Sequence, residues 1–196
     1  MNKREMLKEF ILARGIVVEE TILSSGKKSP YYYDIKQAIL TPEALDLAGD
    51  LGLESIKSFS AKSVGGLESG SIPFSTAIAL KSKGTGSPVQ PFFVRKKART
   101  HGRGKWIEGN LLPPAVIVDD VITTGASALD AANKINEETG QLVAAIVAVV
   151  DREEGAKELF ASKGIPFRSI FTHTKDFKSF IEKGLASKKA EASQTT

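Results

Sequence analysis

Two neighbouring carboxylates followed by a hydroxyl-rich turn give the segment 115–127 the clearest potential for chemistry. Four apolar residues predict a buried strand that ends at Val118, and Asp119 and Asp120 come directly after it. Two threonines and a glycine then form a short loop, and Ser127 is expected to open a helix. Because loop N–H groups and a helix N-terminus beyond the end of a parallel strand favour phosphate, the segment predicts an anion site.

The paired acids distinguish this segment from an ordinary phosphate loop. Asp119 and Asp120 would repel a bare phosphate, so they indicate ribose hydroxyls or a Mg²⁺ ion carried on the same ligand. A phosphorylated ribose offers both kinds of group. The alternative is a plain strand–turn–helix with a solvated acidic corner, in which Ser127 and Asp130 form a capping box. A nucleoside triphosphatase loop is not indicated, because the segment lacks the Gly-Lys-Ser/Thr sequence.

A second candidate is the basic segment 95–105, which contains six cations, two glycines and no acid. The six cations are Arg95, Lys96, Lys97, Arg99, Arg103 and Lys105. The composition predicts a mobile loop whose repelling charges are relieved by closing over a polyanion such as pyrophosphate. The alternatives are a solvated charge run or a nucleic-acid patch, but aromatic residues for base stacking are not interleaved with the cations.

The overall composition argues against several other classes of protein. The formal net charge is +4, yet without the six cations of the loop 21 basic residues stand against 23 acidic ones. The basic excess therefore belongs to one segment, and a nucleic-acid partner is not expected. Zero cysteines exclude disulfides, thiolate metal sites and a cysteine nucleophile. Neither a signal peptide nor an apolar run of the ~20 residues needed to cross a bilayer is present, so we expect a cytoplasmic protein without a membrane partner.

Two further segments fall where ligands bind in an open α/β sheet. The glycine-rich segment 65–73 contains Glu68, Ser69 and Gly70 and could present N–H groups to an anion, although it could also be a simple tight turn. Arg152 follows a nine-residue apolar strand, and could bind a carboxylate bidentately or form a salt bridge with Glu153 or Glu154. His173 is interpreted as a strand-end residue with a satisfied ring.

The pattern of elements predicts an α/β fold with a mainly parallel sheet. After an amphipathic helix that ends at Gly15, the strands are expected at 16–23, 31–35, 62–66, 89–94, 115–118, 142–150 and 167–172. The later helices are expected at 42–59, 72–83, 127–139, 153–162 and 176–185. Continuously apolar strands alternating with helices predict a sheet covered on both faces. We expect one domain over 1–185, with a small hood at about 1–40, and a disordered tail at 186–196.

The segment 119–127 resembles the phosphoribosyl pyrophosphate (PRPP) motif of type I phosphoribosyltransferases. With the basic loop, Arg152 and the tyrosine-rich segment 23–34, the chain resembles the orotate phosphoribosyltransferases from about Gly15 to Thr172. The resemblance implies the type I phosphoribosyltransferase fold with an N-terminal hood. It also implies Mg²⁺-dependent transfer of the 5-phosphoribosyl group from PRPP to orotate, giving orotidine 5′-monophosphate and pyrophosphate in pyrimidine biosynthesis.

The same resemblance implies roles for individual residues. PRPP would contact part of the basic loop and the whole motif: Arg95, Lys96, Arg99, His101, Asp119, Asp120, Val121, Ile122, Thr123, Thr124, Gly125, Ala126 and Ser127. Orotate would contact Tyr32, Tyr33, Thr123 and Arg152. The pyrophosphate loop would be Glu68, Ser69 and Gly70, and the catalytic residues Lys96, Arg99 and His101. Asp119 and Asp120 would hold Mg²⁺, directly or through water.

A homodimer is implied as well, because in this family the basic loop reaches into the neighbouring subunit's site. The chain departs from the family pattern in three places. Arg99 stands where many members have lysine, and since arginine stays protonated, His101 is the better candidate for a general acid. Ser69-Gly70 replaces a Tyr-Lys pair of some relatives, and Ser24 replaces a lysine.

Three other functions are compatible with parts of the pattern. A purine-specific phosphoribosyltransferase would keep the PRPP motif but has no evident use for Arg152. A non-catalytic PRPP-sensing regulator would be expected to carry a DNA-binding domain, for which 196 residues leave no room. A nucleic-acid-binding module rests only on the charges of the loop.

Overall fold

The computed structural model describes residues 1–22, 28–98 and 105–194 and is built around a six-stranded sheet. The strand order is β10-β9-β8-β5-β6-β7. The strands are β5 (Ser63–Gly65), β6 (Gln90–Val94), β7 (Ile107–Gly109), β8 (Ala115–Ile122), β9 (Ala145–Asp151) and β10 (Phe167–Thr172). Neighbouring strands run parallel except β6 and β7, which are antiparallel.

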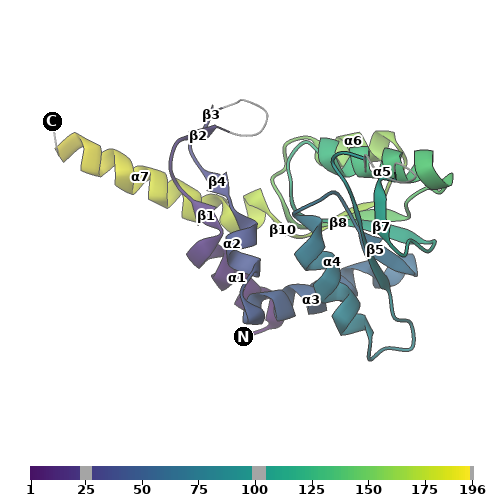
Figure 1. Ribbon diagram of the computed structural model, residues 1–196. Coiled ribbons are helices and arrows are strands. Elements are labelled where there is room, and N and C mark those ends of the chain that lie inside the picture. Colours follow the sequence, from purple (N-terminus) through teal and green to yellow (C-terminus); the bar gives the residue numbers. More distant parts are fainter. Residues whose placement is uncertain (23–27, 99–104, 195–196) are drawn as a thin grey trace.

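Helices cover both faces of this sheet (Figure 1). On one face lie α3 (Pro42–Ile56), extended by a 3₁₀ turn (Lys57–Phe59), and α4 (Ser71–Ser82). On the other face lie α5 (Ala126–Thr139) and α6 (Ala156–Ser162). A hydrophobic core lies on each face of the sheet, and alternate residues of β8 are buried in one or the other. Val116 and Val118 lie on the α3 side, and Ala115 and Ile117 lie on the α5 side. The predicted mainly parallel sheet flanked by helices is thus confirmed.

Strand β8 is longer than its side chains predict. The expected end was Val118, but the strand continues to Ile122, so Asp119 and Asp120 lie within it rather than after it. The cause is β9, which runs alongside as far as Asp151 and pairs its last residue with Ile122. Pairing of the backbone is independent of side-chain polarity, and so the polar residues did not end the strand.

Helix α5 begins at Ala126, one residue before the expected Ser127. Its N-cap is Gly125, which has a left-handed φ of 83°. A Cβ atom at this position would lie 2.6 Å from Phe160 Cζ, so the turn needs glycine for both conformation and space. The alternative capping box is wrong, because the N-cap makes no side-chain hydrogen bond and Asp130 instead accepts from Lys134 at 2.8 Å.

The N-terminal elements lie beside the sheet (Figure 1). They are α1 (Lys3–Arg14), β1 (Ile16–Val17), β2 (Thr21–Ile22), β3 (Lys28–Ser29), β4 (Tyr32–Tyr33) and α2 (Ile35–Ile39). β1 pairs with β4 and β2 with β3, in antiparallel ladders of two residues each. These strands are shorter than expected, and Ile35 starts a helix instead of ending a strand.

The last described element is a long helix that packs against the N-terminal elements. A π-helical turn (His173–Phe177) leads into α7 (Lys178–Gln194). Ile181 is buried in the same core as Leu7 of α1, and Gly184 packs against Val18. The expected disorder from residue 186 is wrong for 186–194, because alanine, lysine and glutamate in this segment are good helix formers. No helix in the described part of the chain combines the length and apolar character needed to cross a membrane.

Candidate functional site

A cavity of about 570 Å³ opens at the carboxyl end of β8 and brings together most residues of the predicted site. Its lining from β8 and the following turn is Asp119, Asp120, Val121, Ile122, Thr123, Thr124, Gly125, Ala126, Ser127 and Ala128. The N-terminal elements add Thr21, Ile22, Tyr32, Tyr33 and Lys36, and the loop after β9 adds Arg152 and Glu154. The motif and Arg152 therefore meet at one edge of the sheet, as expected from its topology, and the tyrosines that the resemblance assigned to the site face the same space.

The turn between β8 and α5 has the chemistry of a phosphate site. Thr123 and Thr124 supply hydroxyls, and the first residues of α5 have N–H groups without partners inside the helix. Because the helix dipole places partial positive charge at the same end, an anion is favoured there. Gly125 lets the backbone make this turn against the buried Phe160 ring.

The two carboxylates lie against the glycine-rich loop. A Cβ atom at Gly70 would lie 2.3 Å from Asp120 Oδ1 and 2.8 Å from Asp119 Oδ1, so the loop contacts both side chains through bare backbone. The peptide bond between Glu68 and Ser69 is cis. Burial, and then the charge of Asp120, raise the pKa of Asp119 well above its ordinary value. The pair is therefore an acceptor-rich site that needs a cation or hydroxyl donors as its ligand.

Lys36 is a residue of this site that the sequence interpretation missed. It comes from α2 and lines the cavity, and its Nζ lies 3.2 Å from Asp120 Oδ2. Burial is the largest single influence and works to lower the pKa of Lys36, but the charge and hydrogen bond of Asp120, together with Tyr32 and Asp34, raise that pKa overall. The ammonium group thus stays charged beside the carboxylates. It lies two residues beyond the tyrosine-rich segment 23–34, and nothing in the sequence marks it as a partner of Asp120.

Arg152 has a buried guanidinium group with an unpaired hydrogen-bond donor. Its side chain is 4% exposed, and Nη2 donates to Glu154 Oε1 at 2.8 Å, which is the salt bridge considered as the alternative. The Nε atom is buried and has no hydrogen-bond partner. The guanidinium carbon lies 5.1 Å from the Tyr31 ring centroid and 5.4 Å from that of Tyr33. An unpaired donor on a buried cation is costly, and a bound carboxylate would satisfy it.

The described base of the basic loop is anchored outside the cavity. Arg95 Nε donates to Glu108 Oε1 at 2.8 Å, and the Lys96 N–H donates to Glu68 Oε1 at 2.8 Å. Lys134, a second residue that was missed, donates to the carbonyl oxygens of Arg95 and Lys96 at 3.3 Å each. Its Nζ also lies 4.3 Å from the Trp106 ring centroid. Arg95, Lys96, Glu68 and Ser69 therefore lie near one another but do not line the cavity, and Arg99, His101 and Ser24 lie outside the described residues.

Comparisons with known proteins match this chain over most of its length to curated orotate phosphoribosyltransferases. No protein-family model matches the chain. The orotate phosphoribosyltransferase of Rhodopseudomonas palustris (strain BisB18) is 39% identical over 182 residues, covering 90% of this chain and 97% of that protein. The orotate phosphoribosyltransferase of Aquifex aeolicus (strain VF5) is 43% identical over 176 residues, covering 87% and 96% of the two chains.

Solved structures give the same result. Mycobacterium tuberculosis H37Rv orotate phosphoribosyltransferase in complex with Fe(III) dicitrate superposes with a TM-score of 0.75 at 35% identity, covering 87% of this chain and 97% of the other. The same enzyme in complex with PRPP gives a TM-score of 0.71 at 33% identity, covering 87% and 96%. The predicted fold class is confirmed by these neighbours.

Proposed function

The chain belongs to the orotate phosphoribosyltransferase family. We propose which of its residues bind PRPP, which bind orotate, and which assist the transfer of the 5-phosphoribosyl group from PRPP to orotate. The products are orotidine 5′-monophosphate and pyrophosphate, a step of pyrimidine biosynthesis. The observation that carries the assignment is the single cavity shared by the PRPP motif and Arg152. One wall suits a phosphorylated sugar, and the other suits an acidic base.

PRPP occupies the wall formed by β8 and α5. Its 5-phosphate binds the N–H and hydroxyl groups of residues 123–127, where the helix dipole and the loop donors favour an anion. Asp119 and Asp120 accept hydrogen bonds from the ribose hydroxyls or bind them through the metal. The loop of Glu68, Ser69 and Gly70 faces the pyrophosphate with backbone donors, because the Cβ of any side chain at position 70 would collide with Asp120.

Asp119 and Asp120 fit Mg²⁺ by the chemistry of their oxygens. Mg²⁺ binds through one or two carboxylates together with waters and substrate phosphates, rather than in a cage made only of protein. The described residues contain no group of three or more His, Cys, Asp or Glu side chains that could hold a metal, so the remaining ligands would have to be water and substrate oxygens. When bound, Mg²⁺ would neutralise charge on the pyrophosphate as it leaves.

Orotate occupies the wall formed by Arg152, Tyr32, Tyr33 and Thr123. The free Nε of Arg152 and its remaining Nη donors meet the carboxylate of the base. Ring N1 of orotate then forms a bond to C1′ of the ribose as the C1′–O bond to pyrophosphate breaks, through an oxocarbenium-like state. The electron pair of the broken bond leaves with pyrophosphate, and the proton of N1 passes to the departing pyrophosphate or to water. Positioning and electrostatic stabilisation supply most of the acceleration, and closure of the basic loop excludes the water that would hydrolyse the activated sugar.

The basic loop completes the site in this assignment. Lys96, Arg99 and His101 contact the pyrophosphate, with His101 as the candidate general acid, and Arg95 supports them. We propose a cytoplasmic homodimer in which each loop serves the neighbouring subunit's cavity. Support comes from the position of Arg95 and Lys96, which are held outside the cavity of their own chain.

Removing one cation of the loop should slow catalysis without unfolding the protein. We expect Arg99→Ala or Lys96→Ala to lower kcat by ~10²–10³-fold, the usual loss when one charge-stabilising group is removed. Circular dichroism and the melting temperature of Lys96→Ala should stay as in the wild type, because the Lys96 side chain is exposed. Steady-state kinetics measure the effect, and wild-type turnover in both purified variants would contradict the assignment of the loop.

Removing the positive charge of Lys36 should lower the catalytic efficiency with PRPP. Lys36→Met is expected to lower kcat/KM for PRPP on the order of 10-fold. This loss is smaller than that expected for a fully desolvated cation, because the Lys36 side chain is 41% exposed. Lys36→Arg should recover most of the loss because it keeps the charge. Lys3→Met is the matched control, since Lys3 also pairs with an aspartate, Asp50, but lies outside the cavity. Equal kinetics in the Lys36 and Lys3 variants would show that Lys36 has no part in PRPP binding.

The reaction itself is tested by mixing the protein with Mg²⁺, PRPP and orotate. Loss of the ultraviolet absorbance of orotate measures turnover, with uracil and adenine as control bases. We expect turnover with orotate and little with either control, since both lack the carboxylate that Arg152 recognises. Preference for adenine would favour the purine-specific alternative.

A further inference from the structure

The tyrosines beside Arg152 are held by a histidine from the end of the sheet. His173 Nδ1 lies 2.9 Å from the Tyr33 hydroxyl. The His173 ring stacks on Tyr31, with 5.4 Å between centroids and 9° between planes. The same two tyrosine rings flank the Arg152 guanidinium. A continuous set of contacts therefore leads from His173 through Tyr31 and Tyr33 to the arginine.

The contact between His173 and Tyr33 joins two uncharged groups. Burial lowers the pKa of His173, which favours the neutral ring. Burial, and then the neighbouring Tyr31, raise the pKa of Tyr33, so its hydroxyl keeps its proton. A neutral imidazole with its proton on Nε2 accepts at Nδ1 from this hydroxyl. The hydrogen bond thus fixes the direction of both rings.

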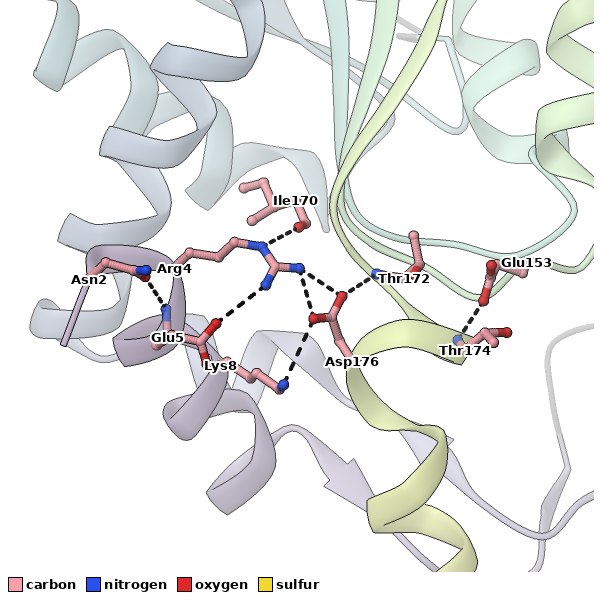
Figure 2. Close-up of polar contacts among 9 residues, drawn as sticks. All are labelled: Asn2, Arg4, Glu5, Lys8, Glu153, Ile170, Thr172, Thr174 and Asp176. Carbon is pink, nitrogen blue, oxygen red and sulfur yellow. Dashed lines mark hydrogen bonds and ion pairs between the residues drawn. The ribbon is translucent and has the colours of Figure 1, made fainter.

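The turn that carries His173 is tied firmly to the N-terminal helix α1 (Figure 2). Asp176, whose side chain is 2% exposed, accepts from Arg4 Nη2 at 2.8 Å with each oxygen and from the Thr172 N–H at 3.0 Å. Arg4 Nε also donates to the Ile170 carbonyl at 3.1 Å. Charge-assisted bonds to a buried carboxylate are strong and directional. They hold the start of the turn against β10 and α1.

A second tie joins the turn to the residue after Arg152. The Thr174 N–H donates to Glu153 Oε2 at 2.5 Å (Figure 2). The Glu153 N–H donates to Asp151 Oδ1 at 2.8 Å, and Glu153 has a left-handed φ of 59°. Arg152 itself donates its N–H to the Ile122 carbonyl at 2.9 Å. The backbone on both sides of Arg152 is thus fixed by the turn and by β8.

We propose that His173 is a positioning residue for the orotate site, which holds Tyr31 and Tyr33 against Arg152 so that the guanidinium faces the carboxylate of the base. His173 does not line the cavity, and so it acts through its neighbours. The inference rests on the proposed role of Arg152. It predicts that His173 affects the binding of orotate but not the binding of PRPP, which occupies the opposite wall of the cavity.

His173→Phe tests the inference, because it keeps an aromatic ring and removes the acceptor for Tyr33. We expect the KM for orotate to rise about 3- to 10-fold, the effect of losing one neutral hydrogen bond, while the KM for PRPP stays within about twofold. Lys175→Ala is the matched control in the same turn. Lys175 is exposed, and its variant should keep both KM values.

A double-mutant cycle with Tyr33→Phe separates this role from a general loss of stability. Both single variants remove the same hydrogen bond, so His173→Phe should add little in the Tyr33→Phe background. A wild-type KM for orotate in His173→Phe, additive effects in the double variant, or equal rises in both KM values with a lower melting temperature would each overturn the inference. Arg152→Ala is measured alongside. If it raises the KM for orotate and His173→Phe does not, only the inference fails; if Arg152→Ala is itself silent, the proposed orotate site fails.

Discussion

Arg152→Ala should raise the KM for orotate by about 100-fold or more while leaving the KM for PRPP close to its wild-type value. Removing one partner of a buried charge pair costs ~2–5 kcal/mol, because the substrate carboxylate would enter a desolvated pocket with no cation to meet it. The protein should remain folded, since the partner that Arg152 leaves behind, Glu154, is partly exposed and can be hydrated. Steady-state kinetics with each substrate varied in turn provide the measurement.

Arg152→Lys is the informative companion variant. It keeps the charge but loses the planar pair of donors, so its KM for orotate should fall between those of the wild type and Arg152→Ala. Glu154→Ala serves as the control for the salt bridge and should affect orotate far less than either change at Arg152. If Arg152→Ala bound orotate as the wild type does, the carboxylate of the base would have to bind elsewhere.

Asp119→Asn should reduce kcat/KM for PRPP by ~10²–10³-fold and at the same time raise the melting temperature. Because burial and Asp120 raise the pKa of Asp119, its ionised form destabilises the folded protein at neutral pH. Asparagine removes this charge and keeps an acceptor for the Asp120 N–H, which lies 3.0 Å from Asp119 Oδ1. Function and stability are therefore expected to change in opposite directions.

The pH dependence provides a check on the cause. A carboxyl group whose pKa is raised by folding destabilises the folded protein when it is ionised. This loss of stability vanishes below the ordinary aspartate pKa of about 3.9, where the group is protonated in both the folded and the unfolded protein. The advantage of Asp119→Asn in melting temperature should therefore shrink as the pH falls from 7.5 toward 4. A lower melting temperature than the wild type at pH 7.5 would contradict this account. Unchanged affinity for PRPP with Mg²⁺ in Asp119→Asn combined with Asp120→Asn would contradict the ribose site.

The sequence predicted an element well where the signals for that element come from consecutive residues. β10 (Phe167–Thr172) matches its expected range because its flanking turns and apolar residues are local signals. The strand β7 (Ile107–Gly109) was missed, since three residues carry too little periodicity and its formation depends on pairing with β6. The extension of β8 past Val118 has the same origin, because β9 supplies the hydrogen bonds.

The same distinction applies to the site. The motif from Asp119 to Ser127 could be recognised because its residues are consecutive, and Arg152 because it follows an apolar strand. Lys36 meets Asp120 from 84 positions away, and Lys134 holds the base of the basic loop from 38 and 39 positions away. Contacts of this kind arise only from packing, so composition and spacing could not indicate them.

Gly70 limits how the positive charge of this active site can be rearranged. A lysine on the glycine-rich loop, as the Tyr-Lys relatives have, requires a Cβ atom at a point 2.3 Å from where Asp120 Oδ1 now lies. The Asp120 side chain would have to move, and the geometry of the bond between its Oδ2 and Lys36 would change with it. A residue larger than glycine at position 70 and the present pairing of Lys36 with Asp120 therefore depend on the same carboxylate.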